Sequence, residues 1–286
     1  MSGLDLKGRV YLLTGASRGI GALSARQLAA RGAHVLAVAR DELALEALSR
    51  ELEAEGRGAL TAIKRDLCER DSLVEWAEEL WERYGPFDGV IHNAGVDDFQ
   101  PSETMDPVAL TRQVDLNLTA PLLINRALLP LLLAEGRGTL IHLCSVAGYL
   151  PTPFGAVYSA TKAGLWAYNE ALAIEYAHSP LVFISVHPGF VHGSGMHERH
   201  KARAGRAPLA LGGTSDQAVV ELICRSLARA ERARSGPVIV NRNPTRPLIV
   251  LTHAMPRLGR WLMARLARPY LARVAGVEPH SLTDRR

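Results

Sequence analysis

With 286 residues, 48% of them hydrophobic, the chain is long enough to bury one large core and to carry a further segment. This composition excludes a disordered or collagen-like protein. The formal net charge of +4 is compatible with phosphate-bearing ligands, an anionic membrane surface or nucleic acid, and does not choose among them.

The N-terminal residues lead directly into a strand and lack the charged and apolar regions of a signal peptide. The most apolar segment, residues 122–133, is interrupted by Asn125, Arg126 and Pro130, and no apolar run approaches the roughly 20 residues that span a bilayer. The three cysteines are far apart and lack CxxC spacing, which argues against a disulfide framework or a zinc site. We therefore expect a cytoplasmic protein without a metal site, with at most a peripheral contact to a membrane.

Short apolar runs alternate with helical patterns along most of the chain. The runs that read as buried strands are residues 10–13, 34–38, 59–63, 89–92, 139–144, 183–187 and 238–240. Asp106 followed by Pro107 predicts a helix start, because the aspartate can cap the helix and proline is favoured in its first turn. Repeated strand–helix–strand units predict an α/β fold: a Rossmann-type, doubly wound parallel sheet with helices on both faces.

The first strand is followed by the sequence TGASRGIG at residues 14–21, which leads into a helix. Glycines at such a junction allow a tight turn and a close backbone approach, and the helix N-terminus favours an anion. An ordinary turn is the alternative, but the position after the first strand favours a phosphate-binding loop. The cofactor contacts expected in this loop are Gly15, Ser17, Arg18, Gly19, Ile20 and Gly21.

The spacing of these glycines resembles the TGxxxGxG fingerprint of the short-chain dehydrogenase/reductase family, and the resemblance continues through successive motifs from residue 8 to about residue 240. The resemblance implies a nicotinamide dinucleotide cofactor. It also implies further cofactor contacts in three places: an aspartate on the adenine after the third strand, an NNAG turn after the fourth, and a PGxVxT turn on the nicotinamide. The matching residues here are Asp66 and Leu67, then Asn93, Ala94 and Gly95, then Pro188, Gly189 and Val191.

Two of these motifs depart from the family pattern. His92 replaces the first asparagine of the NNAG turn, with little expected consequence. Gly193 stands where the family has the threonine of PGxVxT, so the usual hydrogen bond of that threonine is in doubt, and Ser194 or backbone groups are the candidates to replace it.

The end of the second strand decides between the two nicotinamide cofactors. A carboxylate there binds the ribose 2′-hydroxyl of NAD, whereas an arginine accepts the 2′-phosphate of NADP. The strand ends at Arg40, and Arg18 in the glycine loop is a second cation for the same phosphate. The prediction is therefore NADP(H); NAD(H) remains possible if Asp41 turns in to hold the hydroxyl.

Tyr158 and Lys162 are four residues apart, so on a helix their side chains share a face. A neighbouring ammonium is expected to lower the pKa of the phenol towards the working range of a proton donor or acceptor. A surface tyrosine with a solvated lysine is the alternative. The family resemblance adds Ser145, at the end of the fifth strand, as the residue that binds the substrate oxygen. It also adds Asn117, which in the family kinks its helix and holds a water leading to the lysine.

Together these residues predict an NADP(H)-dependent oxidoreductase that interconverts a carbonyl and an alcohol. Residues 146–154, with Tyr149, Leu150 and Phe154, suit a hydrophobic substrate: a ketone, a steroid-like molecule or a fatty acyl carbonyl. A non-catalytic dinucleotide sensor or scaffold that kept the fold is the main alternative. Basicity alone suggests a nucleic-acid binder, and no recognised motif supports one.

Residues 193–213 correspond to the variable lid of the family, and the lid contains Met196, His197, Arg199, His200, Lys201, Arg203 and Arg206.

The composition changes near the C-terminus, which predicts an oxidoreductase domain over residues 1–243 and a basic, amphipathic helical extension over residues 244–286. On one side of this helix we expect Leu258, Trp261, Leu262, Leu266 and Leu271, with Arg257, Arg260, Arg265 and Arg268 largely elsewhere. Pro269 should kink or end the helix. The extension either rests on a membrane surface or packs across the substrate cleft or a partner subunit.

Family members usually pair through two long helices, which here begin at about Pro107 and Ala156. The resemblance therefore implies a homodimer or homotetramer.

Overall fold

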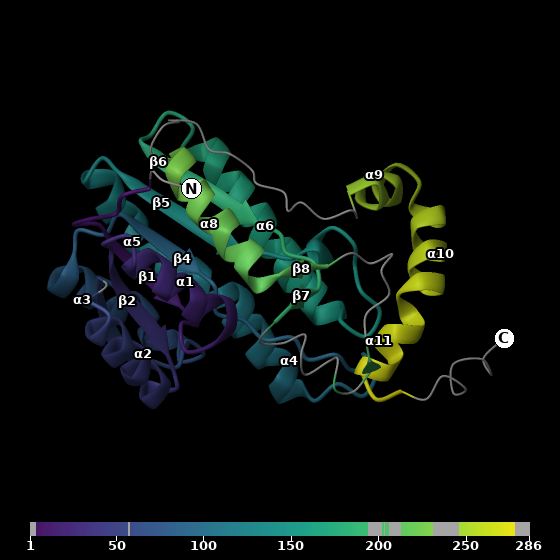
Figure 1. Ribbon diagram of the computed structural model, residues 1–286. Coiled ribbons are helices and arrows are strands. Elements are labelled where there is room, and N and C mark those ends of the chain that lie inside the picture. Colours follow the sequence, from purple (N-terminus) through teal and green to yellow (C-terminus); the bar gives the residue numbers. More distant parts are fainter. Residues whose placement is uncertain are drawn as a thin grey trace.

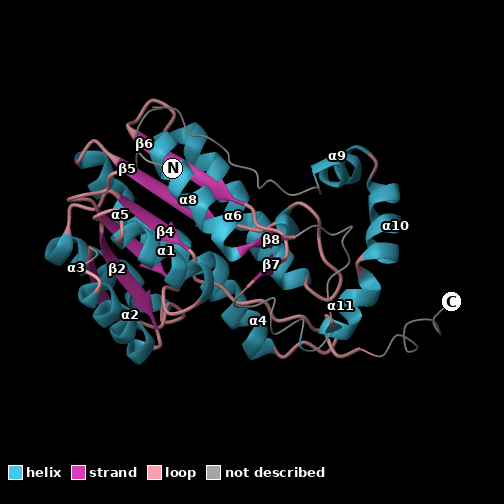
Figure 2. Ribbon diagram, in the orientation of Figure 1, coloured by secondary structure: helices cyan, strands magenta, loops and turns pink. Residues whose placement is uncertain are grey.

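The computed structural model describes residues 4–56, 58–193, 202, 204–205, 213–230 and 246–277. Within them a six-stranded parallel sheet has the order β3-β2-β1-β4-β5-β6 (Figures 1 and 2). Its strands are β1 (Val10–Thr14), β2 (His34–Ala39), β3 (Ala59–Lys64), β4 (Gly89–His92), β5 (Gly138–Leu143) and β6 (Leu181–Val186). The predicted doubly wound sheet is confirmed; the strand expected at residues 238–240 and the domain boundary after residue 243 lie outside the described residues.

Helices cover both faces of the sheet, as Figure 2 shows. Side chains of α1 (Gly19–Ala29), α2 (Glu42–Ala54) and α8 (Asp216–Ala230) form one buried cluster with the sheet, and those of α3 (Leu73–Tyr84), α5 (Ala120–Ala134) and α6 (Ala156–Glu175) form a second. The strand order reverses between β1 and β4, because the chain first winds outward to β3 and then crosses to the other side. Ligands of such sheets bind outside the carboxyl ends of the strands at this switch point.

A long helix begins at Pro107, as expected, and it contains one irregular turn. Asp106 accepts hydrogen bonds from the amides of Val108 and Ala109, so the predicted start of α4 (Pro107–Val114) is confirmed. A π-helical turn (Asp115–Thr119) then joins α4 to α5, giving a 28-residue helix over Pro107–Ala134.

By length and composition alone this helix could cross a bilayer, yet half of its most apolar window is buried inside the protein. Asn125, Arg126 and Pro130 interrupt the apolar run of the sequence but not the helix, which continues through all three. Asn125 is satisfied inside the core by hydrogen bonds to His92 and His142.

Three short helices form the C-terminal extension: α9 (Arg246–Ala254), α10 (Pro256–Leu266) and α11 (Arg268–Val274). They stand beside one end of the sheet, near β7 (Val191–His192) and β8 (Thr214–Ser215) (Figure 1). The predicted break is confirmed, because α10 ends before Ala267 and Pro269 lies in the first turn of α11.

The expected apolar stripe of the extension is largely not its buried side. Leu258, Trp261 and Leu266 are exposed, and of the five predicted side chains only Leu271 is fully buried. The buried side instead carries Met263, Ala267, Tyr270, Leu271 and Val274, which pack with Val146, Leu150 and Ala204. The extension therefore packs across the end of the domain rather than standing apart from it.

Candidate active site

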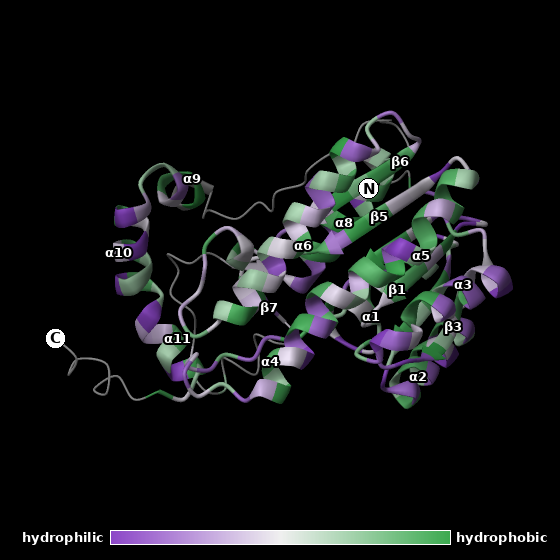
Figure 3. Cartoon of the chain, turned by 180° about the vertical axis from the view of Figure 1, so that it is seen from behind, coloured by the Kyte–Doolittle hydropathy of each residue, from purple (hydrophilic) through white to green (hydrophobic). Residues whose placement is uncertain are grey.

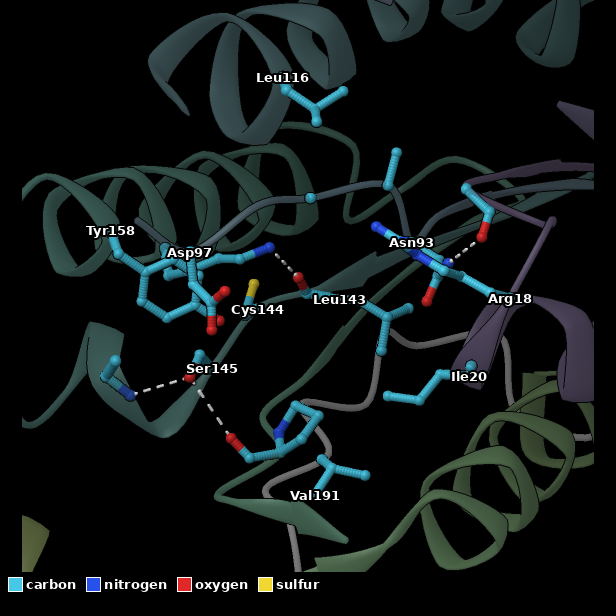
Figure 4. Close-up of a pocket in the computed structure, with 18 of the residues that line it drawn as sticks. Arg18, Ile20, Asn93, Asp97, Leu116, Leu143, Cys144, Ser145, Tyr158 and Val191 are labelled. Carbon is cyan, nitrogen blue, oxygen red and sulfur yellow. Dashed lines mark hydrogen bonds between the residues drawn. The ribbon is translucent and has the colours of Figure 1, made fainter. Parts of the chain in front are cut away.

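A cavity of about 480 Å³ opens at the carboxyl ends of β1, β2, β4 and β5 (Figure 4), a size typical of small-molecule sites. All the residues expected to contact the cofactor line it, as do Ser145, Tyr158 and Lys162. Asn117 is the one predicted site residue that does not. The structure thus brings together residues that are up to 176 positions apart, from Gly15 to Val191.

The glycine loop is held in a shape that leaves a helix N-terminus open to the cavity. Gly15 has φ of 69°, and a Cβ there would lie 2.7 Å from the Cα of Ala94, so only glycine fits. The side-chain amide of Asn93 donates to the carbonyls of Thr14 and Gly15, both at 3.0 Å. Helix α1 begins at Gly19 with no side-chain cap on its first amides. These free amides fit a pyrophosphate.

The end of the cavity near β2 favours a phosphate over a hydroxyl. The guanidinium of Arg40 is about half exposed and lies 3.8 Å from the carboxylate of Asp66. Asp41, the alternative residue for a ribose hydroxyl, accepts the amide of Ala44 at 3.1 Å and thereby caps α2. Arg18 lines the same cavity. Two guanidiniums and a carboxylate engaged in a helix cap form a site that suits a 2′-phosphate.

Three of the catalytic candidates come from the end of β5 and from α6, and Figure 4 labels two of them, Ser145 and Tyr158. Ser145 follows β5; its hydroxyl accepts the amide of Ala147 at 3.1 Å and donates to the carbonyl of Pro188 at 3.4 Å. Tyr158 and Lys162 lie one turn apart on α6, with the ammonium 5.9 Å from the centre of the phenol ring. Lys162 is buried and donates to the carbonyl of Leu143 at 2.7 Å. This bond fixes the lysine against the end of β5.

The titration of Tyr158 differs from the expectation. Burial raises the pKa of Tyr158, the negative charge of Asp97 raises it further, and a hydrogen bond with Ser145 opposes both effects in part. Burial also lowers the pKa of Lys162. The expected lowering of the tyrosine pKa by Lys162 is therefore wrong for the protein by itself, because desolvation of the phenolate outweighs the attraction of an ammonium directed at Leu143.

Asp97 lines the cavity and lies beside Tyr158 (Figure 4), so its removal should alter the pH dependence of the reaction. In Asp97→Asn the phenolate loses a neighbouring negative charge, so the pKa of Tyr158 should fall. Carbonyl reduction, which needs the protonated phenol, should then lose its rate at a lower pH than in the wild type, and alcohol oxidation should rise at a lower pH. Rates measured between about pH 8 and 12, on both sides of the ordinary tyrosine pKa of about 10, test this.

The matched control is Asp98→Asn, because Asp98 is adjacent in sequence and does not line the cavity. If both variants keep the wild-type profile, or shift it equally, Asp97 does not tune Tyr158.

Asn117 links two of the chain segments that form the site. It lies in the π-helical turn, is fully buried, and exchanges hydrogen bonds of 2.8 Å with both backbone groups of Val96; its amide also donates to Thr161 at 3.2 Å. These contacts join the loop after β4 to α6, which carries Tyr158. The irregular helix matches the predicted kink, and the water path to Lys162 stays a prediction.

Several residues of the cavity were not predicted from the sequence. The charged ones are Asp97, two positions after the Asn93–Gly95 turn, and Arg65, directly after β3. The apolar ones are Phe99, Leu116, Phe190, Met263, Ala267 and Leu271. The sequence did contain a pattern for the last three, because Met263, Ala267 and Leu271 recur every four residues. The larger side chains Leu258, Trp261 and Leu262 predicted a different buried side of the helix. Of the predicted wall, Val146, Ala147, Leu150 and Thr152 line the cavity. Phe154 does not, and Tyr149 points to His187 and packs on Trp166.

Gly193 has a structural reason to replace a threonine. Its φ is 114°, which side-chain-bearing residues rarely adopt, and a Cβ there would lie 2.7 Å from Asp216. Ser194 and most of the expected lid, including Met196, His197, Arg199, His200, Lys201, Arg203 and Arg206, lie outside the described residues.

The histidines near the site are buried and make contacts inside the core. His92 and His142 stack at 4.9 Å between ring centres, and His187 contacts the carbonyl of Ser145. Burial lowers the pKa of His92 and of His187 to about 4, so both are neutral near pH 7. In the described part of the chain no group of three or more His, Cys, Asp or Glu is placed to hold a metal ion.

Comparison with known proteins places this site in a family. The family model for short chain dehydrogenases matches residues 9–204. A ketoacyl reductase of Nostoc sp. is 30% identical over 264 residues, which cover 92% of this chain and 89% of that protein. The 3-oxoacyl-[acyl-carrier-protein] reductase of Escherichia coli is 30% identical over 188 residues, covering 66% of this chain and 75% of that protein.

Solved structures with a similar fold also come from oxidoreductases. A metagenomic short-chain oxidoreductase in complex with NADP superposes with a TM-score of 0.68 at 31% identity, covering 82% of this chain and 97% of that one. A putative NAD(P)-dependent gluconate 5-dehydrogenase from Beutenbergia cavernae, with bound NADP at low occupancy, gives a TM-score of 0.71 at 26% identity and covers 82% of this chain and 96% of that one.

Proposed function

The chain belongs to the short chain dehydrogenase family, and we propose that it is an NADP(H)-dependent oxidoreductase that interconverts a carbonyl and an alcohol on a fatty acyl substrate. One observation carries the proposal: a single cavity joins the glycine loop, the Ser145–Tyr158–Lys162 group and an apolar wall. The NADP-bound relative and the pair Arg18 and Arg40 support NADP(H) over NAD(H).

The chemistry of the site follows from the positions of its side chains. A nicotinamide held in the cavity would supply or receive the hydride. Ser145 holds the substrate oxygen by a hydrogen bond, and Tyr158 gives its phenolic proton to that oxygen during reduction or removes it during oxidation. Lys162, buried beside Tyr158, attracts the phenolate left after the transfer and offsets part of the desolvation that raises the pKa of Tyr158. Its second role would be to bind the hydroxyls of the nicotinamide ribose.

The apolar wall favours an acyl chain over a sugar acid. Phe99, Leu150 and Phe190 face the cavity from the main domain, and Met263, Ala267 and Leu271 face it from the extension. Burial of such side chains against an alkyl chain stabilises the complex by about 0.8 kcal/mol per methylene group, whereas polyol hydroxyls would lose their hydrogen bonds to water there. Ketoacyl reductases among the relatives fit this class, and gluconate dehydrogenases among them do not.

Dependence on chain length tests the substrate class. With NADPH and β-ketoacyl thioesters of increasing length, kcat/KM should rise with each added methylene until the cavity is filled. Ala267→Leu, which narrows the cavity from α10–α11, should lower kcat/KM for the long substrates about tenfold and leave the shortest substrate nearly unchanged.

The control is Ala264→Leu, on the exposed side of the same extension. Equal kcat/KM for all chain lengths, or turnover of polyols alone, would contradict a fatty acyl substrate. NADPH binding without turnover of any carbonyl would favour the alternative, a dinucleotide sensor or scaffold.

We also infer a cytoplasmic homodimer or homotetramer. The helices that pair in the resembling family correspond to α4 and α6. Among the described residues of the main domain, the most exposed large apolar side chains besides Leu43 lie on these helices, namely Val108 on α4 and Ile174 on α6. Pairing of two such surfaces would remove them from water.

A further inference from the structure

The C-terminal extension has an extreme charge composition. Residues 244–286 contain eight arginines against one glutamate and one aspartate, so the formal charge of the extension exceeds the net charge of +4 of the whole chain. The described part of the extension, residues 246–277, contains six of these arginines and neither aspartate nor glutamate. A segment of this kind needs an anionic partner or remains in solvent.

The inner side of the extension is already occupied. Met263, Ala267 and Leu271 line the cavity that contains Tyr158. Tyr270 packs edge-on against Phe190, with 5.7 Å between ring centres. These contacts fix α10 and α11 over the apolar part of the site and leave the opposite side of α10 outward.

Hydrophilic and more hydrophobic residues alternate along α10 (Figure 3). On its outer side Trp261 is 55% exposed and Leu258 is 37% exposed, and Met255 just before the helix is 53% exposed. Arg257, Arg260 and Arg265 are exposed among them, and the guanidinium of Arg265 lies 5.7 Å from the centre of the Trp261 ring. A tryptophan, aliphatic side chains and arginines on one exposed helix side are typical of helices that lie in a membrane interface.

The positive charge of the extension favours a membrane over a second copy of the chain as the partner of this helix side. A two-fold contact would place this side of α10 against itself and bring the arginines of two copies together, with no carboxylate in the described part of the extension to compensate. An anionic lipid surface instead offers headgroups for the guanidiniums and an acyl boundary for Trp261 and Leu258.

We propose that the outer side of α10, with Met255 before it, binds the surface of an anionic lipid membrane. The same short helix then contacts lipid on one side and roofs the substrate cavity on the other. The membrane contact itself follows from the extension alone; its use, the capture of acyl substrates at the membrane, rests on the proposed function.

Vesicle co-sedimentation of the full-length protein tests the binding. Vesicles of phosphatidylglycerol and phosphatidylcholine should retain the protein, and vesicles of phosphatidylcholine alone should retain much less. The double variant Leu258→Ser/Trp261→Ser should bind at least about tenfold more weakly. The triple variant Arg257→Gln/Arg260→Gln/Arg265→Gln should lose about 100-fold, at roughly fivefold per cation.

Leu43→Ser is the matched control, since Leu43 is 75% exposed on α2, outside the extension and the cavity. It should bind vesicles as the wild type does. Turnover of a short soluble substrate is measured in parallel, because none of these side chains lines the cavity and the variants should keep that activity.

Three results would overturn the proposal: no sedimentation of the wild type with anionic vesicles, equal binding by the wild type and both extension variants, or binding of duplex DNA in place of vesicles. Dissociation of an oligomer by Leu258→Ser/Trp261→Ser without vesicle binding would show an interface between copies instead. Vesicle binding without any turnover would leave the membrane contact intact and contradict the proposed function alone.

Discussion

Replacing Tyr158 by phenylalanine should reduce turnover by about 10³-fold, within the range that general acid–base catalysis contributes. The phenolic proton is the one that reaches the substrate oxygen, and phenylalanine keeps the ring and its packing against Phe99 at 6.3 Å. The affinity for NADPH should change little, because most of the cofactor contacts come from other elements. Steady-state rates and an NADPH fluorescence titration measure the two effects separately.

Tyr149→Phe is the control for this variant. The hydroxyl of Tyr149 contacts His187 at 3.3 Å and does not line the cavity, so its loss should leave turnover within a few-fold of the wild type. Substantial activity in Tyr158→Phe would assign proton transfer to another group. A joint loss of NADPH binding would show that the variant disturbs the cofactor site instead.

Replacing Arg40 by alanine should weaken NADPH binding about 10- to 100-fold, the loss of one or two hydrogen bonds to a charged group. NADH binding should change less than about threefold, because NADH lacks the 2′-phosphate that the guanidinium would bind. Titrations with both cofactors, at fixed ionic strength because charge contacts are screened by salt, measure the ratio.

Arg50→Ala on α2, the helix that follows Arg40, is the matched control, since Arg50 is exposed and does not line the cavity. If Arg40→Ala weakens both cofactors equally, the guanidinium supports the site through its contact with Asp66 and not through a phosphate. If neither affinity changes, Arg18 alone would have to set the preference.

Local motifs made much of the site predictable. The glycine loop depends on residues 14–21, and the spacing of Tyr158 and Lys162 depends on one helical turn, so both are encoded over short stretches. The alternation of apolar strands and amphipathic helices was sufficient for the doubly wound sheet, because parallel strands are buried on both faces.

Features that depend on tertiary contacts were predicted poorly. The effect of Asp97 on Tyr158 arises only when the loop after β4 reaches α6, and no spacing in the sequence encodes that approach. The extension has apolar residues on two sides, and only its packing against Phe190 and Leu150 decides that Met263 and Ala267 are the inner ones. Asn125 read as an interruption because its partners, His92 and His142, come from two strands of the sheet.

The most direct test of the proposed oxidoreductase is a single-turnover reaction with enzyme in excess over NADPH, started by a medium-chain β-ketoacyl thioester. We predict that the NADPH absorbance decays in one fast phase and that a hydroxyacyl product forms in equal amount, with both changes lost in Tyr158→Phe. NADPH that is bound by the protein yet stays reduced with this and every other carbonyl would contradict the proposal and identify the chain as a dinucleotide-binding protein without catalytic activity.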